Sequence, residues 1–510
     1  MLAKSLGYFA QGMYGRAVHV EVYAEQGIPG IDIIGLPDTS VKESKSRVGA
    51  AIVNSGFAMP VAHMTVNLAP AFLRKEGTSY DLAIAVAILS ATGQLPDNDF
   101  TDICLIGELS LDGSVQPVRG VFAMVLSAQE NGLTEFIVPA DNAAEVSSID
   151  GVRIYPAKSL EQVTRHLRGT ERIPAQRQRP YSEVAAQAHP AVDLAQVQGQ
   201  LMARRALEVA AAGGHNMLMV GVPGSGKTML ARCLPGILPP MTFEESLETT
   251  RIYSIAGALE PGSGLMVLRP FCAPHHTASD VSLVGGGTNA MPGAISLSHN
   301  GVLFLDELPE FSRGAMEALR QPLEDGIVTI QRIHTVGKYP SRFMFVAAMN
   351  PCPCGNYGSR TRPCRCKPME IRRYLDRVSG PLLDRIDIQI EVDAVPLSEI
   401  RQDRPAESSA EVAERVRRAR AIQQERYRGM PIHCNAQLRR TNWSRWCRLD
   451  SESQGLLNLA VESLGLSMRG YERVVKIART IADLRGAEAI ARDDVAEAVT
   501  YRELEHKYWR

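Results

Sequence analysis

Apolar residues recur with two different periods in the first third of the chain, and each period predicts one kind of element. Apolar and polar residues alternate in residues 18–23 and 63–68, which is typical of strands with one buried face. Residues 39–52 and 81–89 instead carry apolar side chains at helical spacing. Strands and helices therefore mix without strict alternation, and we expect residues 1–168 to form an α/β domain.

The middle of the chain contains short, unbroken apolar runs. Residues 217–220 and 343–349 have no charged or hydroxyl-bearing side chain, a pattern that predicts strands buried on both faces of a parallel sheet. Stretches with helical spacing lie before and between these runs, at residues 201–211 and 313–323. Residues 193–396 are therefore predicted to form a second α/β domain.

The last part of the chain is predicted to be helical. Residues 409–427, 472–484 and 492–499 show helical spacing, and basic residues occupy the polar face of the first stretch. We expect residues 397–510 to form a helical lid domain. Residues 169–192 are polar, contain several prolines and lack a period, so they are predicted to be an exposed linker.

The second α/β domain contains a phosphate-binding loop. Residues 221–228 read GVPGSGKT and match the pattern G-x-x-x-x-G-K-[ST], and they stand between a predicted strand and a helix. Glycines allow backbone N–H groups to face phosphates, Lys227 adds a point charge, and the Thr228 hydroxyl can reach Mg²⁺. The residues assigned to nucleotide binding are Gly221, Val222, Pro223, Gly224, Ser225, Gly226, Lys227 and Thr228.

Further residues of a hydrolytic site follow downstream. Asp306 and Glu307 end the apolar run of residues 302–305, where Asp306 would hold Mg²⁺ and Glu307 would orient the attacking water. Asn350 ends the next apolar run and can position the same water. Arg385 is suited to act on the nucleotide of a neighbouring subunit. The sequence therefore predicts an ATP hydrolase with Mg²⁺ as its cofactor.

The charge of the chain is unevenly distributed. The formal net charge is −1, yet residues 1–168 carry 12 Lys/Arg against 18 Asp/Glu, and residues 327–448 carry 23 against 12. A region with a net charge of +11 favours a polyanionic partner such as DNA, although solvated helix faces also produce such asymmetry. No apolar run approaches the roughly twenty residues of a membrane span, and the N-terminus lacks a signal-peptide pattern, so we expect a cytoplasmic protein.

Four of the nine cysteines cluster in two C-x-C pairs. A set of four thiolates suits tetrahedral zinc, and a reduced cytoplasm favours a metal site over a disulfide framework. The alternative is a flexible loop with four free thiols. The predicted zinc ligands are Cys352, Cys354, Cys364 and Cys366, and the neighbouring candidates for phosphate contacts are Arg360, Arg362, Arg365 and Lys367.

The paired histidines His275 and His276 lie in a glycine-rich and proline-rich segment, residues 254–300. No cysteine or carboxylate stands at a metal-ligand spacing from them. We therefore expect them to be surface groups or to contact phosphate.

Residues 74–81, RKEGTSYD, resemble the nucleophile loop of Lon-type proteases, with Ser79 at the serine position. Residues 107–118 resemble the hairpin that precedes the catalytic lysine of that family, which places Phe122 at the lysine position. This resemblance implies a Lon-like (ribosomal S5 domain 2-like) fold. Because phenylalanine cannot activate a serine hydroxyl, peptidase activity is not expected, and Ser79 is predicted to cap a helix or stabilise a turn.

The motifs GVPGSGKT, APHHTAS, GVLFLDEL, AAMNPCPCG and SGPLLDRID together resemble the ComM/YifB family of magnesium-chelatase-like AAA+ proteins with a Lon-like N-terminal domain. The resemblance covers nearly the whole chain. It implies a homo-hexamer that acts as an ATP-driven DNA branch-migration helicase in natural transformation. It also implies that Arg469 is the sensor-2 arginine of the lid, and that Arg332 and Lys338, on a hairpin predicted around residues 333–335, face the pore and contact DNA phosphates.

Three other functions remain open on the sequence. A chelatase-type motor would remodel a protein partner, but the Lon-like domain and the four-cysteine loop argue against it. An ATP-dependent protease would need a base for Ser79. A non-enzymatic role would require an inactive nucleotide site, whereas every expected residue of that site is present.

Overall fold

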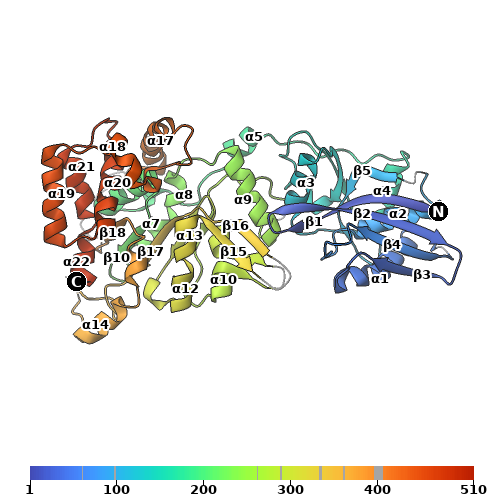
Figure 1. The fold of residues 1–510 in the computed structure, drawn as a ribbon, viewed down its shortest axis with the longest axis horizontal. Helices are drawn as coiled ribbons and strands as arrows, with labels where there is room; N and C mark the ends of the chain where they lie inside the picture. Colours follow the sequence, from blue (N-terminus) through green and yellow to red (C-terminus); the bar gives the residue numbers. More distant parts are fainter. Residues whose placement is uncertain are drawn as a thin grey trace.

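The computed structural model describes residues 1–59, 61–96, 99–260, 262–287, 290–331, 336–359, 362–394 and 406–509. The molecule is elongated, with the N-terminal domain at one end, the C-terminal helices at the other and the nucleotide-binding core between them (Figure 1). Among the described residues, no helix combines the length and the apolar character that a membrane span requires.

The N-terminal domain is built on a seven-stranded mixed sheet with the order β3-β4-β2-β1-β5-β8-β9. Its strands are β1 Leu2–Gln11, β2 Tyr14–Glu25, β3 Gly30–Ile34, β4 His63–Ala69, β5 Asp99–Leu105, β8 Glu135–Pro139 and β9 Arg153–Ala157, and β6 Glu108–Leu109 and β7 Val115–Gln116 form a separate hairpin. The helices are α1 Thr39–Asn54, α2 Asp81–Ala91, α3 Val121–Glu130 and α4 Leu160–Leu167. The four elements predicted from hydrophobic period lie within β2, β4, α1 and α2. Every residue of α2 is buried, which explains its continuous apolar pattern.

The segment predicted to be an exposed linker is held against its neighbours. Ile173 is buried in the N-terminal core, and the Gln176 N–H donates to the Ile154 carbonyl at 2.8 Å. The segment then forms a short helix, α5 Tyr181–Ala186, and the Tyr181 hydroxyl donates to the Met241 carbonyl of the core. Within residues 169–192 Ile173 alone is buried, so the connector is largely exposed, as predicted, but it is fixed by these contacts. Composition predicted the exposure of this segment, whereas its contacts to both domains depend on the tertiary structure.

The core is a five-stranded parallel sheet with the order β11-β14-β17-β10-β18. Its strands are β11 Phe271–Cys272, β14 Val302–Leu305, β17 Met344–Met349, β10 Met217–Val220 and β18 Ile388–Glu391. The surrounding helices are α6 Leu201–Gly213, α7 Lys227–Arg232, α8 Leu234–Ile237, α9 Phe243–Ala256, α10 Asp280–Val284, α11 Ala294–Leu297, α12 Arg313–Ala318, α13 Arg320–Asp325, α14 Pro368–Leu375 and α15 Gly380–Leu383. Two antiparallel ribbons, β12 Gly285–Gly286 with β13 Met291–Pro292 and β15 Ile327–Gln331 with β16 Val336–Pro340, extend from it. Strands β10 and β17 are fully buried, as their unbroken apolar runs predicted.

One predicted core helix is divided. Residues 313–323 were expected to form a single helix, but α12 ends at Ala318 and α13 begins at Arg320. Pro322 lacks the backbone N–H that would bond to the Ala318 carbonyl, and its ring would meet that carbonyl. The apolar period runs across the break and therefore conceals it.

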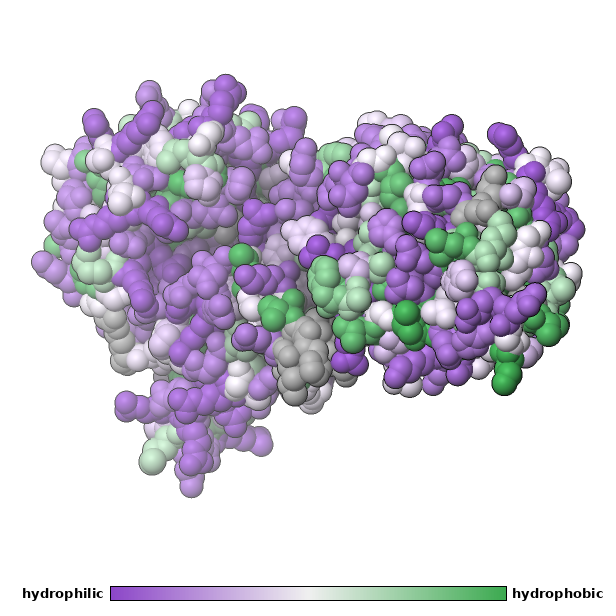
Figure 2. Space-filling model, turned by 45° about the vertical axis from the view of Figure 1, so that its right-hand side comes forward, coloured by the Kyte–Doolittle hydropathy of each residue, from purple (hydrophilic) through white to green (hydrophobic). Residues whose placement is uncertain are grey.

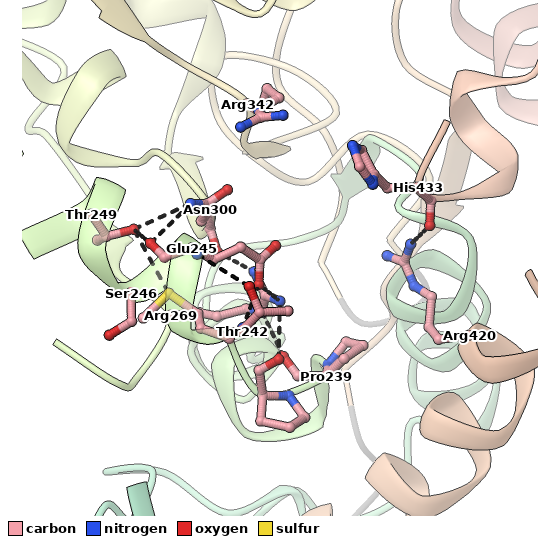
Figure 3. Close-up of polar contacts among 12 residues, drawn as sticks. Pro239, Thr242, Glu245, Ser246, Thr249, Arg269, Asn300, Arg342, Arg420 and His433 are labelled. Atoms are coloured by element: carbon pink, nitrogen blue, oxygen red, sulfur yellow. Dashed lines mark hydrogen bonds and ion pairs between the residues drawn. The ribbon is translucent and has the colours of Figure 1, made fainter. Parts of the chain in front are cut away.

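The long segment between α9 and β14 is fixed by Arg269. This side chain donates to the Asn300 carbonyl at 2.7 Å and to Glu245 at 2.8 Å, and its Nε donates to the Pro239 carbonyl at 2.5 Å (Figure 3). Thr242 and Glu245 form a capping box at the start of α9. An irregular segment thereby gains a defined path beside the central sheet.

The C-terminal helices are α17 Ser409–Arg426, α18 Trp443–Trp446, α19 Ser451–Leu464, α20 Met468–Leu484, α21 Arg492–Thr500 and α22 Glu503–Trp509. Asp483 is buried among them and accepts from Asn435 at 2.8 Å and from Arg426 and Arg479. Trp443 and Trp446 are partly buried and pack against the hydrophobic core that these helices share with the central domain. The boundary predicted near residue 396 falls outside the described residues.

Candidate functional site

The P-loop turns sharply between β10 and α7. Gly224 and Gly226 have φ angles of +78° and +88°, in the left-handed region that favours glycine. The loop leads into the N-terminus of α7, where backbone N–H groups that have no partner within the helix can accommodate an anion. The loop therefore has the shape that its sequence predicted.

Lys227 is held by two carbonyls of the P-loop and by Asn350. Its Nζ donates to the carbonyls of Gly221 at 2.7 Å and Val222 at 3.0 Å, and to Asn350 Oδ1 at 3.3 Å. Burial lowers the pKa of Lys227, while the nearby carboxylates of Asp306 and Glu307 oppose that shift. The ammonium group is thus held at the P-loop and linked to Asn350.

Thr228 and Asp306 lie together. The Thr228 hydroxyl donates to Asp306 Oδ2 at 2.7 Å, and the Glu307 N–H donates to Asp306 Oδ1 at 2.9 Å. These oxygen donors fit Mg²⁺, which prefers oxygen ligands and a position beside the phosphates. When bound, Mg²⁺ would neutralise developing charge on the phosphoryl group. The structure therefore brings Lys227, Thr228, Asp306 and Asn350 into one site.

His276 contacts Glu307, a role that sequence reasoning missed. Its Nδ1 lies 3.2 Å from Glu307 Oε2, and Glu307 itself has a φ of +54°, which is uncommon outside glycine. The His275 ring lies against the His276 ring with centroids 4.1 Å apart, and His275 Nδ1 lies 2.8 Å from the Thr277 hydroxyl. His275 is exposed and His276 is partly exposed, in agreement with the expectation of surface groups, and contact of the pair with phosphate stays a prediction. The signal was the position of the pair after β11, because the loops that follow neighbouring parallel strands meet at one sheet edge.

The two predicted arginines are grouped with each other. Arg469 Nη1 lies 2.8 Å from Asp384 Oδ2, and Arg385, the next residue, pairs with Glu324. Within the described part of the chain, neither arginine makes a hydrogen bond or an ion pair with the P-loop. The chain therefore presents the group around the P-loop and, separately, an arginine face made of Arg385 and Arg469.

The four clustered cysteines converge. The sulfur atoms of Cys352 and Cys354 are 3.4 Å apart, each lies 3.7 Å from that of Cys364, and all four, including Cys366, lie within 4.8 Å of one another. Zn–S bonds of about 2.3 Å in a tetrahedron place sulfurs about 3.8 Å apart. Backbone N–H groups, that of Arg365 first, lower the pKa of Cys354 to about 6. The donor set and its spacing fit structural zinc.

Exposed basic side chains flank the cysteines in the sequence, and another lies on β16. Arg362, Arg365 and Lys367 are exposed, and Lys338 is exposed on β16. Helix α14, which follows the cluster, projects from the body, and the projection is largely hydrophilic (Figures 1 and 2). Arg332 and Arg360 lie outside the described residues. Contacts of this group with nucleic acid stay a prediction.

The Lon-like domain has no activated serine. Ser79 is buried, and its hydroxyl donates to the Tyr8 carbonyl at 2.8 Å. Phe122 is fully buried in the apolar core beside α9. Among the described residues, no lysine or histidine bonds to Ser79. The N-cap of α2 is Tyr80, without a side-chain bond, so the predicted capping role of Ser79 is wrong: the hydroxyl instead joins the helix start to β1.

Comparison with known proteins agrees with this arrangement. Residues 193–400 match the family described as magnesium chelatase, subunit ChlI; residues 20–142 match subunit ChlI of Mg-chelatase; and residues 406–502 match its C-terminal part. A 94-residue stretch, 18% of this chain, is 37% identical to an archaeal Lon protease of Thermoplasma acidophilum.

Full-length relatives give the family. The protein YifB of Escherichia coli and the competence protein ComM of Haemophilus influenzae are each 43% identical to this chain over 498 residues, which cover 97% of the chain and 96% of each relative. An uncharacterised protein of Mycobacterium tuberculosis is 41% identical over 503 residues, 98% of this chain and 99% of its own. With its P-loop core, Lon-like domain and C-terminal helices, the chain belongs to the ComM/YifB family of magnesium-chelatase-like AAA+ proteins, a class of fold that implies ATP and Mg²⁺.

Proposed function

We propose that this protein is an ATP-driven DNA motor that promotes branch migration during natural transformation or recombination. The observation that carries the proposal is the separation of two half-sites in one protomer. Lys227, Thr228 and Asp306 form the phosphate side, whereas Arg385 and Arg469 lie together elsewhere. A head-to-tail ring would join the arginine face of one subunit to the nucleotide of the next. The name of the competence protein among the relatives supports the cellular setting.

DNA is the favoured substrate because of charge. Exposed Arg362, Arg365, Lys367 and Lys338 belong to the region of net charge +11, residues 327–448. Phosphate contacts by such residues make binding strongly dependent on salt. ATP hydrolysis by a motor that remodels a protein partner would not respond to DNA.

The test is ATP hydrolysis titrated with single-stranded, duplex and four-way-junction DNA at several salt concentrations, together with migration of a mobile junction. We expect stimulation by branched DNA that weakens steeply with salt, and ATP-dependent conversion of the junction. Lys227→Ala is the control, since it removes the phosphate contact while leaving the basic region intact. Hydrolysis unaffected by any DNA, with a static junction, would contradict the proposal.

The assembly is tested separately. We propose a homo-hexamer, because in a closed ring Arg385 of each subunit would complete the nucleotide site of its neighbour. The measurement is molar mass by light scattering, with and without ATP, on the Glu307→Gln variant, which should hold nucleotide. A mass of about 56 kDa in every condition would overturn the ring and leave the DNA proposal open to its own assay.

We further propose that the four-cysteine cluster binds structural zinc. The sulfur spacing of 3.4–3.7 Å among Cys352, Cys354 and Cys364 carries this assignment. Elemental analysis should find about one zinc per chain, and Cys364→Ser should remove it. Cys272→Ser, outside the cluster, should retain the metal. Equal metal content in the two variants would refute the site.

A further inference from the structure

The four-cysteine loop lies directly on the P-loop. A Cβ atom placed on Gly355 would be 2.6 Å from both Cδ and Cγ of Pro223, and 3.9 Å from Asn350 Cγ. Gly355 follows Cys354 and has a φ of +77°. Only a residue without a side chain allows the loop to approach the proline ring so closely. The cluster and the nucleotide site therefore share a contact surface.

The same loop is also continuous with Asn350. Cys352 stands two residues after Asn350 and is fully buried. Its sulfur accepts from the Tyr357 N–H at 3.3 Å, and its carbonyl accepts from the Gly355 N–H at 2.9 Å. The position of the Cys352 sulfur therefore fixes the turn that holds Gly355 against Pro223.

Regular secondary structure does not hold this turn. The described residues between β17 and α14 form no helix or strand. Long irregular segments need cross-links or specific contacts to keep one conformation, because ordering them costs conformational entropy. Four sulfur ligands around one metal ion provide that cross-link, and a metal-bound site contributes its binding energy to folding.

We propose that the metal cross-link of the four cysteines supports the P-loop, so that nucleotide affinity depends on metal occupancy. This inference rests on the proposed zinc site. Loss of the metal releases Gly355 from Pro223 and frees the chain that follows Asn350. The cradle around Lys227 then loses its support on one side, and ATP binds more weakly.

Two glycines of the loop give a matched test. Gly355 and Gly358 both have a φ of +77°, but a Cβ on Gly358 meets nothing within 4 Å, whereas a Cβ on Gly355 meets Pro223. Gly355→Ala and Gly358→Ala therefore share the same backbone cost and differ in the P-loop contact. We expect both variants to retain zinc. Gly355→Ala alone should bind a fluorescent ADP analogue more weakly, by about fivefold or more, which is the size of effect expected when about one contact is lost. Equal affinities in the two variants overturn the proposal.

Metal removal gives the second measurement. The wild-type protein is stripped with a mercurial reagent and a chelator, and then supplied with Zn²⁺ after thiol release. Nucleotide affinity should fall with the zinc content and recover with it. Protein purified without bound metal overturns the zinc assignment and this coupling together. Metal that leaves without a change in nucleotide affinity overturns the coupling alone.

Discussion

Glu145 provides a pH-dependent test of the contact between the Lon-like domain and the core. Its side chain is buried, and Oε1 accepts from Asn142 Nδ2 at 3.1 Å. Ser254 of α9 also bonds to Glu145, and its hydroxyl accepts from the Phe122 N–H at 3.2 Å. Burial is the main cause that raises the pKa of Glu145 from 4.5 to about 7, against the opposing effect of these two partners.

This shift has a definite sign. The folded state favours the neutral carboxyl, so it binds more protons than the unfolded state between pH 4.5 and about 7. The contribution of Glu145 to the free energy of unfolding is fully present below pH 4.5 and is lost as the pH rises through this window. A change in pKa from 4.5 to about 7 corresponds to about 3 kcal/mol.

Glu145→Gln removes the charge and keeps the shape of the side chain. We expect its stability relative to the wild type to increase by about 2.5 kcal/mol between pH 5 and pH 8, which widens the gap in Tm by roughly 5–10 °C. The assay is thermal unfolding of both proteins across this pH range.

Glu130→Gln is the matched control for that experiment. Glu130 is exposed and lies 3.5 Å from Arg251 of α9. Its replacement therefore removes one charge from the same contact between the domains, but the charge that it removes is not buried. The difference in Tm between Glu130→Gln and the wild type should stay nearly constant with pH. Parallel curves for Glu145→Gln and the wild type would refute the reasoning.

Three further variants probe the nucleotide site. Glu307→Gln should keep ATP binding and slow hydrolysis by about 10²-fold or more, and near-normal turnover would remove Glu307 from its role. Arg385→Ala should be nearly inactive alone, yet regain hydrolysis when mixed with Lys227→Ala, since mixed rings contain interfaces with both wild-type partners; no recovery would argue against action between subunits. His276→Ala frees the Glu307 carboxylate from its partner at 3.2 Å and should lower kcat about tenfold with little change in KM. His275→Ala, which loses a bond to Thr277 instead, should retain kcat, and equal effects of the two histidine variants would contradict a specific role for His276.

Local patterns were readable because consecutive residues determine them. The P-loop is a run of eight residues whose glycines, lysine and threonine act through backbone geometry close by. The buried strands β10 and β17 are marked by their own apolar runs. The spacing of the cysteines predicted a shared ligand set, and the convergence of their sulfurs agrees with it.

Contacts between distant residues depended on the tertiary structure. His276 meets Glu307 because β11 lies beside β14, and Gly355 meets Pro223 because β17 lies beside β10. Arg469 lies beside Asp384 because of how α20 packs against the core. Hydrophobic period specifies which face of a strand is buried, but strand order and helix docking arise from packing across the whole domain. The sequence by itself therefore determined which chemical groups the nucleotide site contains, whereas only the fold decided which groups support and position them.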